Sequence, residues 1–67
     1  MELTKHEKDI LKLIGEGDSN KKIAQKLNMN ENTLKLHVSK LYEKYGVSGK
    51  KNARIRLIVQ AFRAKSL

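Results

Sequence analysis

The sequence predicts an all-α fold: a compact four-helix domain that contains a helix-turn-helix. Apolar residues recur with helical spacing along the chain, Gly and Asn divide that pattern into four pieces, and the 67 residues include no Pro. A chain of this length forms one domain at most, and without Cys it has no disulfide to stabilise it. We therefore expect one domain over residues 1–67, with helices at about 4–15, 19–27, 30–45 and 50–64.

The first helix opens with a capping box. Thr4 can accept a hydrogen bond from the amide three residues on, and Glu7 can reach back to the Thr4 amide. Spacings of three and four then place Glu7 and an apolar stripe on one face, and two Gly residues end the helix. The stripe is Ile10, Leu11 and Ile14, and the Gly residues are Gly15 and Gly17.

The second and third helices have the spacing of a helix-turn-helix. In a unit that begins at Asn20, apolar residues at positions 4, 5, 8, 10 and 15 make a short helix and a longer one cross steeply over a turn of about four residues. Ala24 is small enough to let the helices approach, and Asn28 tolerates the left-handed backbone of the turn. An ordinary antiparallel helical hairpin is the alternative. The five apolar residues are Ile23, Ala24, Leu27, Met29 and Leu34.

Polar caps and Gly residues mark the ends of the later helices. Ser19 and Asn30 are the expected N-caps, Gly46 stops the third helix, and the fourth begins at about Gly49 or Lys50. Between these ends, the third helix is expected to present one apolar stripe to the core. The stripe is Leu34, Val38, Leu41 and Tyr45.

The net charge of +8 is concentrated in one part of the chain. Residues 1–18 hold three Lys against five acidic residues, whereas residues 19–67 hold twelve Lys and Arg against two acidic residues. Such a concentrated positive field attracts polyanions, which means nucleic acid or an anionic membrane surface. A basic protein without a polyanionic partner is the alternative. Because no apolar run is long enough to span a membrane and no signal peptide is recognisable, we expect a cytoplasmic protein.

A set of residues spread over most of the chain matches a known pattern. It comprises Leu3-Thr4, Glu7, Ile10-Leu11, Leu13, Gly17, Ser19-Asn20-Lys21-Lys22-Ile23-Ala24, Leu27, Thr33-Leu34-Lys35, His37-Val38, Lys44 and Gly46-Val47. Over roughly residues 3–62 the chain resembles the LuxR/GerE-type DNA-binding domain. The resemblance implies a four-helix domain that binds DNA through its third helix and often dimerises through its fourth.

Some positions depart from the family pattern. His6 stands where Arg is usual, Lys22 where Glu is usual, and Lys50 where Arg is usual after the third helix. Lys and Arg both contact phosphate, but only Arg does so through two parallel hydrogen bonds. Arg54 occupies a place that is usually apolar. Because the motif begins two residues after Met1, we expect either a free-standing regulator like the spore-regulator branch or an excised fragment.

The outer side of the third helix is the predicted DNA-reading surface, because it has almost no acid and an α-helix fits the major groove of B-DNA. Lys35 can donate to guanine O6 or N7, and an exposed Leu36 can contact a thymine methyl. Two further polar residues on the same side can donate or accept. The predicted base contacts are Asn32, Lys35, Leu36 and Ser39.

Residues on both sides of this surface are predicted to contact phosphate. Such contacts set position and affinity rather than sequence choice. Backbone amides at the start of the second helix also favour an anion. For any single Lys the alternative is a solvated surface charge. The predicted phosphate contacts are Ser19, Asn20, Lys21, Lys22, Thr33, Lys40, Lys44 and Lys50.

The two His residues do not predict a metal site. They lie on different helices without a nearby carboxylate cluster, which is not a set of metal ligands. We expect His37 to be half-buried and hydrogen-bonded, with a phosphate contact as the alternative. The sequence has no Ser-His-acid arrangement, no paired carboxylates and no Gly-rich phosphate loop, so we expect neither an enzyme nor a cofactor.

The fourth helix has two apolar stripes, although one helix at the edge of a small domain needs only one. The spare stripe indicates an isologous contact with a second copy, and a single broad core face is the alternative. We expect Arg54, Arg56 and Arg63 to stay in solvent between the stripes. The dimer contact is predicted to be either Leu57, Ala61 and Ala64 or Ile55, Val59 and Phe62.

These features favour a sequence-specific, double-stranded DNA-binding transcriptional regulator of bacterial style, associated with the nucleoid. Its expected partners are DNA, a second copy of the chain and, during transcription, RNA polymerase. Two rival functions stay open. One is a sigma-factor-like promoter-binding module, and the other is a protein-interaction domain that uses the fourth helix.

Overall fold

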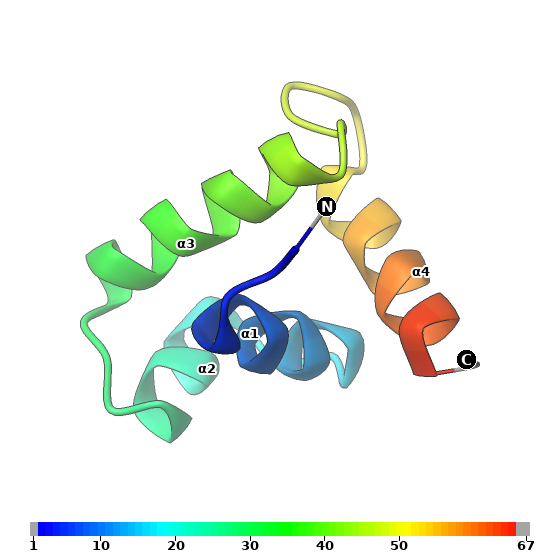
Figure 1. Ribbon diagram of the computed structural model, residues 1–67. Coiled ribbons are helices and arrows are strands. Elements are labelled where there is room, and N and C mark those ends of the chain that lie inside the picture. Colours follow the sequence, from blue (N-terminus) through cyan, green and yellow to red (C-terminus); the bar gives the residue numbers. More distant parts are fainter. Residues whose placement is uncertain (1, 66–67) are drawn as a thin grey trace.

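Four helices make up residues 2–65, the part of the chain that the computed structural model describes. They are α1 (Lys5–Gly15), α2 (Asn20–Lys26), α3 (Glu31–Lys44) and α4 (Ala53–Lys65), and these residues include no strand. In Figure 1, α3 runs above α1 and α2, and α4 closes one end of the molecule. The prediction of an all-α, four-helix domain is confirmed. No helix within residues 2–65 is long and apolar enough to cross a lipid bilayer.

Side-chain caps fix the starts of the first three helices. The Thr4 hydroxyl accepts from the Glu7 amide at 3.2 Å, and the Glu7 carboxylate accepts from the Thr4 amide at 2.8 Å, which confirms the capping box. The Ser19 hydroxyl accepts from the amide three residues on at 3.2 Å, and the Asn30 side chain accepts from the amide two residues on at 2.7 Å. Each cap satisfies an amide that has no partner inside its helix, so these starts follow from the local sequence.

The turn between α2 and α3 has the left-handed backbone that Asn28 allows, with a φ of 53°. The next amide, that of Met29, donates to the Ala24 carbonyl oxygen at 2.8 Å. The side chains of Ile23, Ala24 and Leu34 are buried in the core that α2 and α3 share. The predicted helix-turn-helix is confirmed, and its turn depends on one Asn and one small Ala.

One hydrophobic core contains side chains from all four helices. Burying a large apolar side chain contributes about 1.5–3 kcal/mol to folding. α1 and α4 approach closely at Gly15, because a Cβ atom there would lie 2.7 Å from the Ala61 Cβ. Gly15 is therefore needed for packing between helices, a role that its place at a helix end did not predict. The six fully buried large side chains are Ile10, Ile14, Ile23, Leu34, Leu41 and Leu57.

The last helix begins at Ala53, whereas the sequence pattern predicted a start at about residue 50. The residues before it form turns, and the φ angles of Gly49 and Asn52 are 75° and 60°. A residue with a left-handed backbone cannot be part of a right-handed α-helix. The predicted start is therefore wrong, and Asn52 delays the helix in the same way that Asn28 forms the earlier turn.

Candidate nucleic-acid interface

One face of α3 is turned away from the core and is exposed. The opposite face is fixed in the core by Leu34, Val38 and Leu41. Leu36 is a large apolar side chain that is 66% exposed, and it lies within a row of polar and cationic residues. Spacings of three and four residues give this row one direction along the helix. It contains all four predicted base contacts, Asn32, Lys35, Leu36 and Ser39, and all four are exposed.

Four cations around this face have no acidic partner within residues 2–65. Among residues 2–65, no carboxylate oxygen lies within 4.0 Å of the ammonium groups of Lys21, Lys35, Lys40 and Lys50. All four side chains are exposed, as is the predicted phosphate contact Thr33. Because no carboxylate pairs with them, their field remains available to an anion from outside.

Two Lys residues of α2 lie beside Asp18, which precedes the start of that helix. Lys26 donates to Asp18 Oδ2 at 2.7 Å, and the Lys22 ammonium is 4.0 Å from Oδ1. The hydrogen bond from Lys26 is the main cause that holds the pKa of Asp18 below its ordinary value. Lys26 is therefore held in an ion pair, whereas the Lys22 side chain is 61% exposed and can still reach outward.

Arg54 joins the start of α4 to the start of α2. Its guanidinium donates to the Asn20 side-chain oxygen at 2.7 Å and to the Asp18 carbonyl oxygen at 2.8 Å, and all three residues are half-buried. The expectation that Arg54 stays in solvent is wrong, because its side chain is half-buried. The two acceptors compensate for the cost of that burial. Asn20 holds Arg54 through its oxygen, so only its amide nitrogen is available for the predicted phosphate contact.

Lys44 is engaged inside the protein, although the sequence predicted that it contacts phosphate. Its ammonium donates to Glu7 Oε1 at 2.6 Å and to the Glu2 carbonyl oxygen at 3.3 Å. Glu7 is only 2% exposed, and hydrogen bonds from Lys44 and then from the Thr4 amide lower its pKa from 4.5 to about 2. Removing Lys44 from this pair would leave a buried charge without a partner. Lys44 therefore stabilises the contact between α1 and α3.

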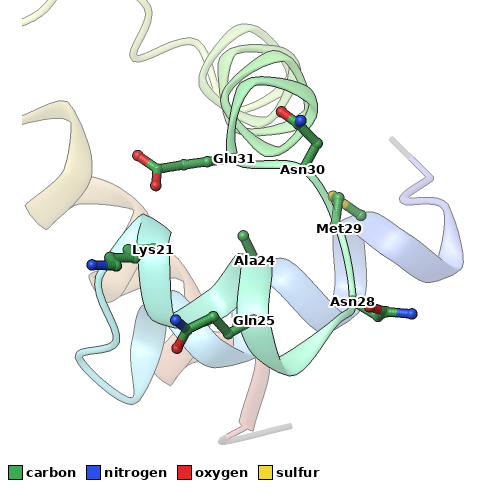
Figure 2. Close-up of a pocket in the computed structure, with 7 residues that line it drawn as sticks. All are labelled: Lys21, Ala24, Gln25, Asn28, Met29, Asn30 and Glu31. Carbon is green, nitrogen blue, oxygen red and sulfur yellow. The ribbon is translucent and has the colours of Figure 1, made fainter.

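An open cleft lies between α2 and α3 beside the turn (Figure 2). The Ala24 methyl points into it from α2, Lys21 reaches from the same helix, and Glu31 reaches from the start of α3. Glu31 is the only acid among the residues that line the cleft. It lies in the first turn of α3, where a negative charge stabilises the helix, and this gives Glu31 a structural role at the edge of the cationic surface.

The two His residues lie together, which the sequence did not predict. The ring centroids of His6 and His37 are 5.7 Å apart, and the ring planes are tilted by 49°. His37 is half-buried, as expected, and the nearby ring comes from α1. Within residues 2–65, no group of three or more His, Asp or Glu residues could hold a metal ion.

The structure distinguishes the two apolar stripes of α4. Leu57 is fully buried and Ala61 is 5% exposed, so both residues belong to the core, whereas Ala64 is exposed. The dimer contact predicted for Leu57, Ala61 and Ala64 together is therefore wrong. The other stripe faces solvent, because Ile55 is 58% exposed, Val59 44% and Phe62 59%. α4 therefore closes the core with one side and presents apolar side chains on another.

Comparison with known proteins places the chain beside bacterial regulators. The family described as "Bacterial regulatory proteins, luxR family" matches residues 1–57. The chain is 41% identical over 54 residues to the nitrate/nitrite response regulator protein NarL of Escherichia coli. It is 44% identical over 54 residues to the uncharacterized transcriptional regulatory protein YhcZ of Bacillus subtilis, and 34% identical over 56 residues to the spore germination protein GerE of the same species.

These similarities cover most of this chain but differ in how much of each relative they include. The aligned part is 81% of this chain for NarL and YhcZ and 84% for GerE. The chain spans 25% of the length of NarL and of YhcZ, and 76% of the length of GerE. No solved structure matches it significantly.

Proposed function

The chain belongs to the luxR family of bacterial regulatory proteins and has the family's DNA-binding helix-turn-helix, and we propose that α3 reads double-stranded DNA in the major groove. The observation that carries this proposal is the exposed row on α3, held outward by the buried stripe behind it. A helix presented in this way fits the major groove, where each base pair has its own pattern of donors, acceptors and methyl groups. Sequence-specific regulation of transcription is the function that follows.

The proposed base contacts divide into polar and apolar ones. Lys35 donates to guanine O6 or N7, and Leu36 packs against a thymine methyl group. Asn32 and Ser39 lie in the same row and complete the reading surface. Each good specific contact is worth about 1–3 kcal/mol of discrimination against the wrong base.

The proposed phosphate contacts lie on both sides of this row. Thr33 and Lys40 flank it on α3, and Lys50 follows it in the loop before α4. The start of α2 adds the exposed Ser19, Lys21 and Lys22 and the amide nitrogen of Asn20. Lys44 is left out, because its ammonium is bound to Glu7.

We further propose that two copies bind one site through α4. The contact is formed by Ile55, Val59 and Phe62, the stripe that faces solvent. A twofold axis between the copies would direct the two α3 helices to half-sites about one DNA turn apart. On this basis the operator is a palindrome, and RNA polymerase is the partner through which the bound regulator acts on transcription.

The exposed stripe of α4 also supports a second candidate, a protein-interaction domain whose basic face is incidental. Salt distinguishes the two, because apolar docking through α4 responds little to ionic strength. A chain that contacts six or more phosphates should lose about three orders of magnitude in affinity for a duplex between about 50 and 200 mM salt. Fluorescence anisotropy with a labelled duplex measures this loss, and a flat salt response would reject the DNA-binding proposal.

Selection of bound duplexes from a random pool tests the specific part of the proposal. We expect a palindrome with two identical half-sites, as a dimer requires. A sigma-factor-like module would instead select a single, non-palindromic element. A pool that shows no enrichment would restrict the chain to non-specific binding.

A further inference from the structure

The exposed stripe of α4 is bordered by cations. The helix sequence ARIRLIVQAFRAK contains four Lys and Arg residues and no Asp or Glu. Arg56 and Arg63 are exposed, and with Gln60 between them they form a row directly beside Ile55, Val59 and Phe62. A stripe used for self-association would ordinarily gain from acids that pair with these cations, and α4 supplies none.

The surroundings of Val59, the middle residue of the stripe, are also positively charged. Val59 lines a cleft between α4 and the segment that follows α3. The same cleft is lined by Lys50, Arg56 and Arg63, and none of its lining residues is acidic. A second copy that packs on Val59 therefore brings its own cations to a site that is already cationic.

Symmetry brings the same positive charge from both copies to a dimer formed through α4. In an isologous contact both copies present the same surface, so Arg56 and Arg63 of one copy approach the cations of the other. Among the described residues, α4 offers three exposed large apolar side chains in return, whereas a stable interface of standard size buries about 800 Å² on each partner. We propose that α4 of the free chain is held from pairing by like charge, and that a polyanion or high salt is needed to permit the contact.

This inference rests on the proposed function, in which DNA is the polyanion that brings two copies together. Bound phosphates reduce the net positive charge that the two chains present to each other. Dissolved salt does the same by screening, because the Debye length falls from about 10 Å at 0.1 M to about 3 Å at 1 M. Salt should therefore strengthen pairing of the free chain while it weakens binding to DNA.

Sedimentation equilibrium of the free chain at about 50 mM and about 500 mM NaCl tests the inference. We expect a monomer at the lower salt, and a dimer dissociation constant that falls by about threefold or more at the higher salt. The double variant Arg56→Gln and Arg63→Gln should pair more tightly at low salt and respond less to added salt. The control is Lys5→Gln and Lys8→Gln, which removes the same charge from exposed positions on α1 and should respond to salt as the parent chain does.

Three outcomes would overturn the inference: a dimer already present at low salt, a dimer that weakens as salt rises, or equal responses of the α4 and α1 double variants. Val59→Gln should abolish the pairing expected at the higher salt, and persistent pairing there would show that the stripe is not the contact. On the selected duplex at low salt, two copies should bind together although the free chain is monomeric. Loss of DNA binding with salt-strengthened pairing intact would reject only the proposed function.

Discussion

The Lys residues of α3 have different surroundings and so different roles. Lys35 lies in the exposed row, where its ammonium has no carboxylate within 4.0 Å among the described residues. Lys40 is also exposed and has no such partner. Lys44 is bound to Glu7 at 2.6 Å and is part of the folded structure. One helix thus supplies a proposed base contact, a proposed phosphate contact and an observed structural ion pair from the same residue type.

Lys35→Ala should change which sequence is bound more than how tightly DNA is bound. Loss of a contact to guanine removes about 1–3 kcal/mol of discrimination at one base-pair position and leaves most phosphate contacts in place. The measurement is the base preference at each position of the selected site, before and after the substitution. An unchanged preference at every position would remove Lys35 from the reading surface.

Lys40→Ala should weaken binding to all duplexes by a similar factor. A lost phosphate contact lowers the slope of log affinity against log salt by about one. Titrations of a specific and an unrelated duplex at several salt concentrations measure it. Lys8→Ala, which removes an exposed cation from α1, should leave the slope unchanged. If the two variants have the same slope, Lys40 does not contact phosphate.

Composition and spacing predicted the exposed row of α3 but could not separate Lys40 from Lys44. The two residues are one helical turn apart, and contacts to the distant Glu2 and Glu7 distinguish them. Glu7 lies in the apolar stripe of α1, and a buried acid requires a partner. That stripe was therefore a usable signal for an ion pair, although it did not identify which Lys is the partner.

At the scale of elements, the contact between α1 and α4 depends on Gly15. In Gly15→Ala the added Cβ would lie 2.7 Å from the Ala61 Cβ, so the helices must move apart. Overpacking of this kind costs about 1–3 kcal/mol, and the higher helix propensity of Ala recovers about 1 kcal/mol at most. We expect a lower midpoint of urea unfolding.

The double variant Gly15→Ala and Ala61→Gly tests whether this loss comes from the clash. Ala61→Gly removes the methyl group that the new side chain meets, so the two changes should cost less together than the sum of their separate effects. Strict additivity, or a Gly15→Ala variant as stable as the parent chain, would contradict the proposed packing role.

Helix starts were predictable where a side chain caps them, and the α4 start was not. Thr4, Ser19 and Asn30 act on amides only two or three residues away, so the local sequence contains the needed information. The start of α4 depends instead on the left-handed backbone of Asn52, which helical periodicity does not detect. The same periodicity could not decide which stripe of α4 is buried, because Gly15 and the neighbouring helices determine that choice.

At the scale of the whole molecule, the Glu7–Lys44 pair joins the first helix to the end of the third. The pKa of Glu7 is lowered from 4.5 to about 2, so its carboxylate favours the folded state when it is ionised. This stabilisation is complete above about pH 5 and is lost as the pH falls from about 4.5 towards 2. A difference of this size corresponds to about 3 kcal/mol in the free energy of unfolding.

Lys44→Met should therefore lower stability at pH 7 and flatten its dependence on pH between about 5 and 2. Urea unfolding at several pH values measures both effects. Lys8→Met serves as the control, because Lys8 is exposed and has no carboxylate partner among the described residues. A parallel loss of stability for the parent chain and Lys44→Met over this range would mean that Glu7 gains little from Lys44.

The hydrogen bonds of Arg54 have a consequence for the spacing between half-sites that two bound copies would accept. They link the start of α4 to the start of α2 through Asn20 and the Asp18 carbonyl oxygen, and so join the helix proposed for the dimer contact to the segment proposed for phosphate contacts. In a pair joined through α4, the two α3 helices would then keep a fixed distance and orientation. One extra base pair between the half-sites rotates one half-site relative to the other by about one-tenth of a turn. A dimer with fixed α3 helices could not follow that rotation, so it should bind such a site more weakly.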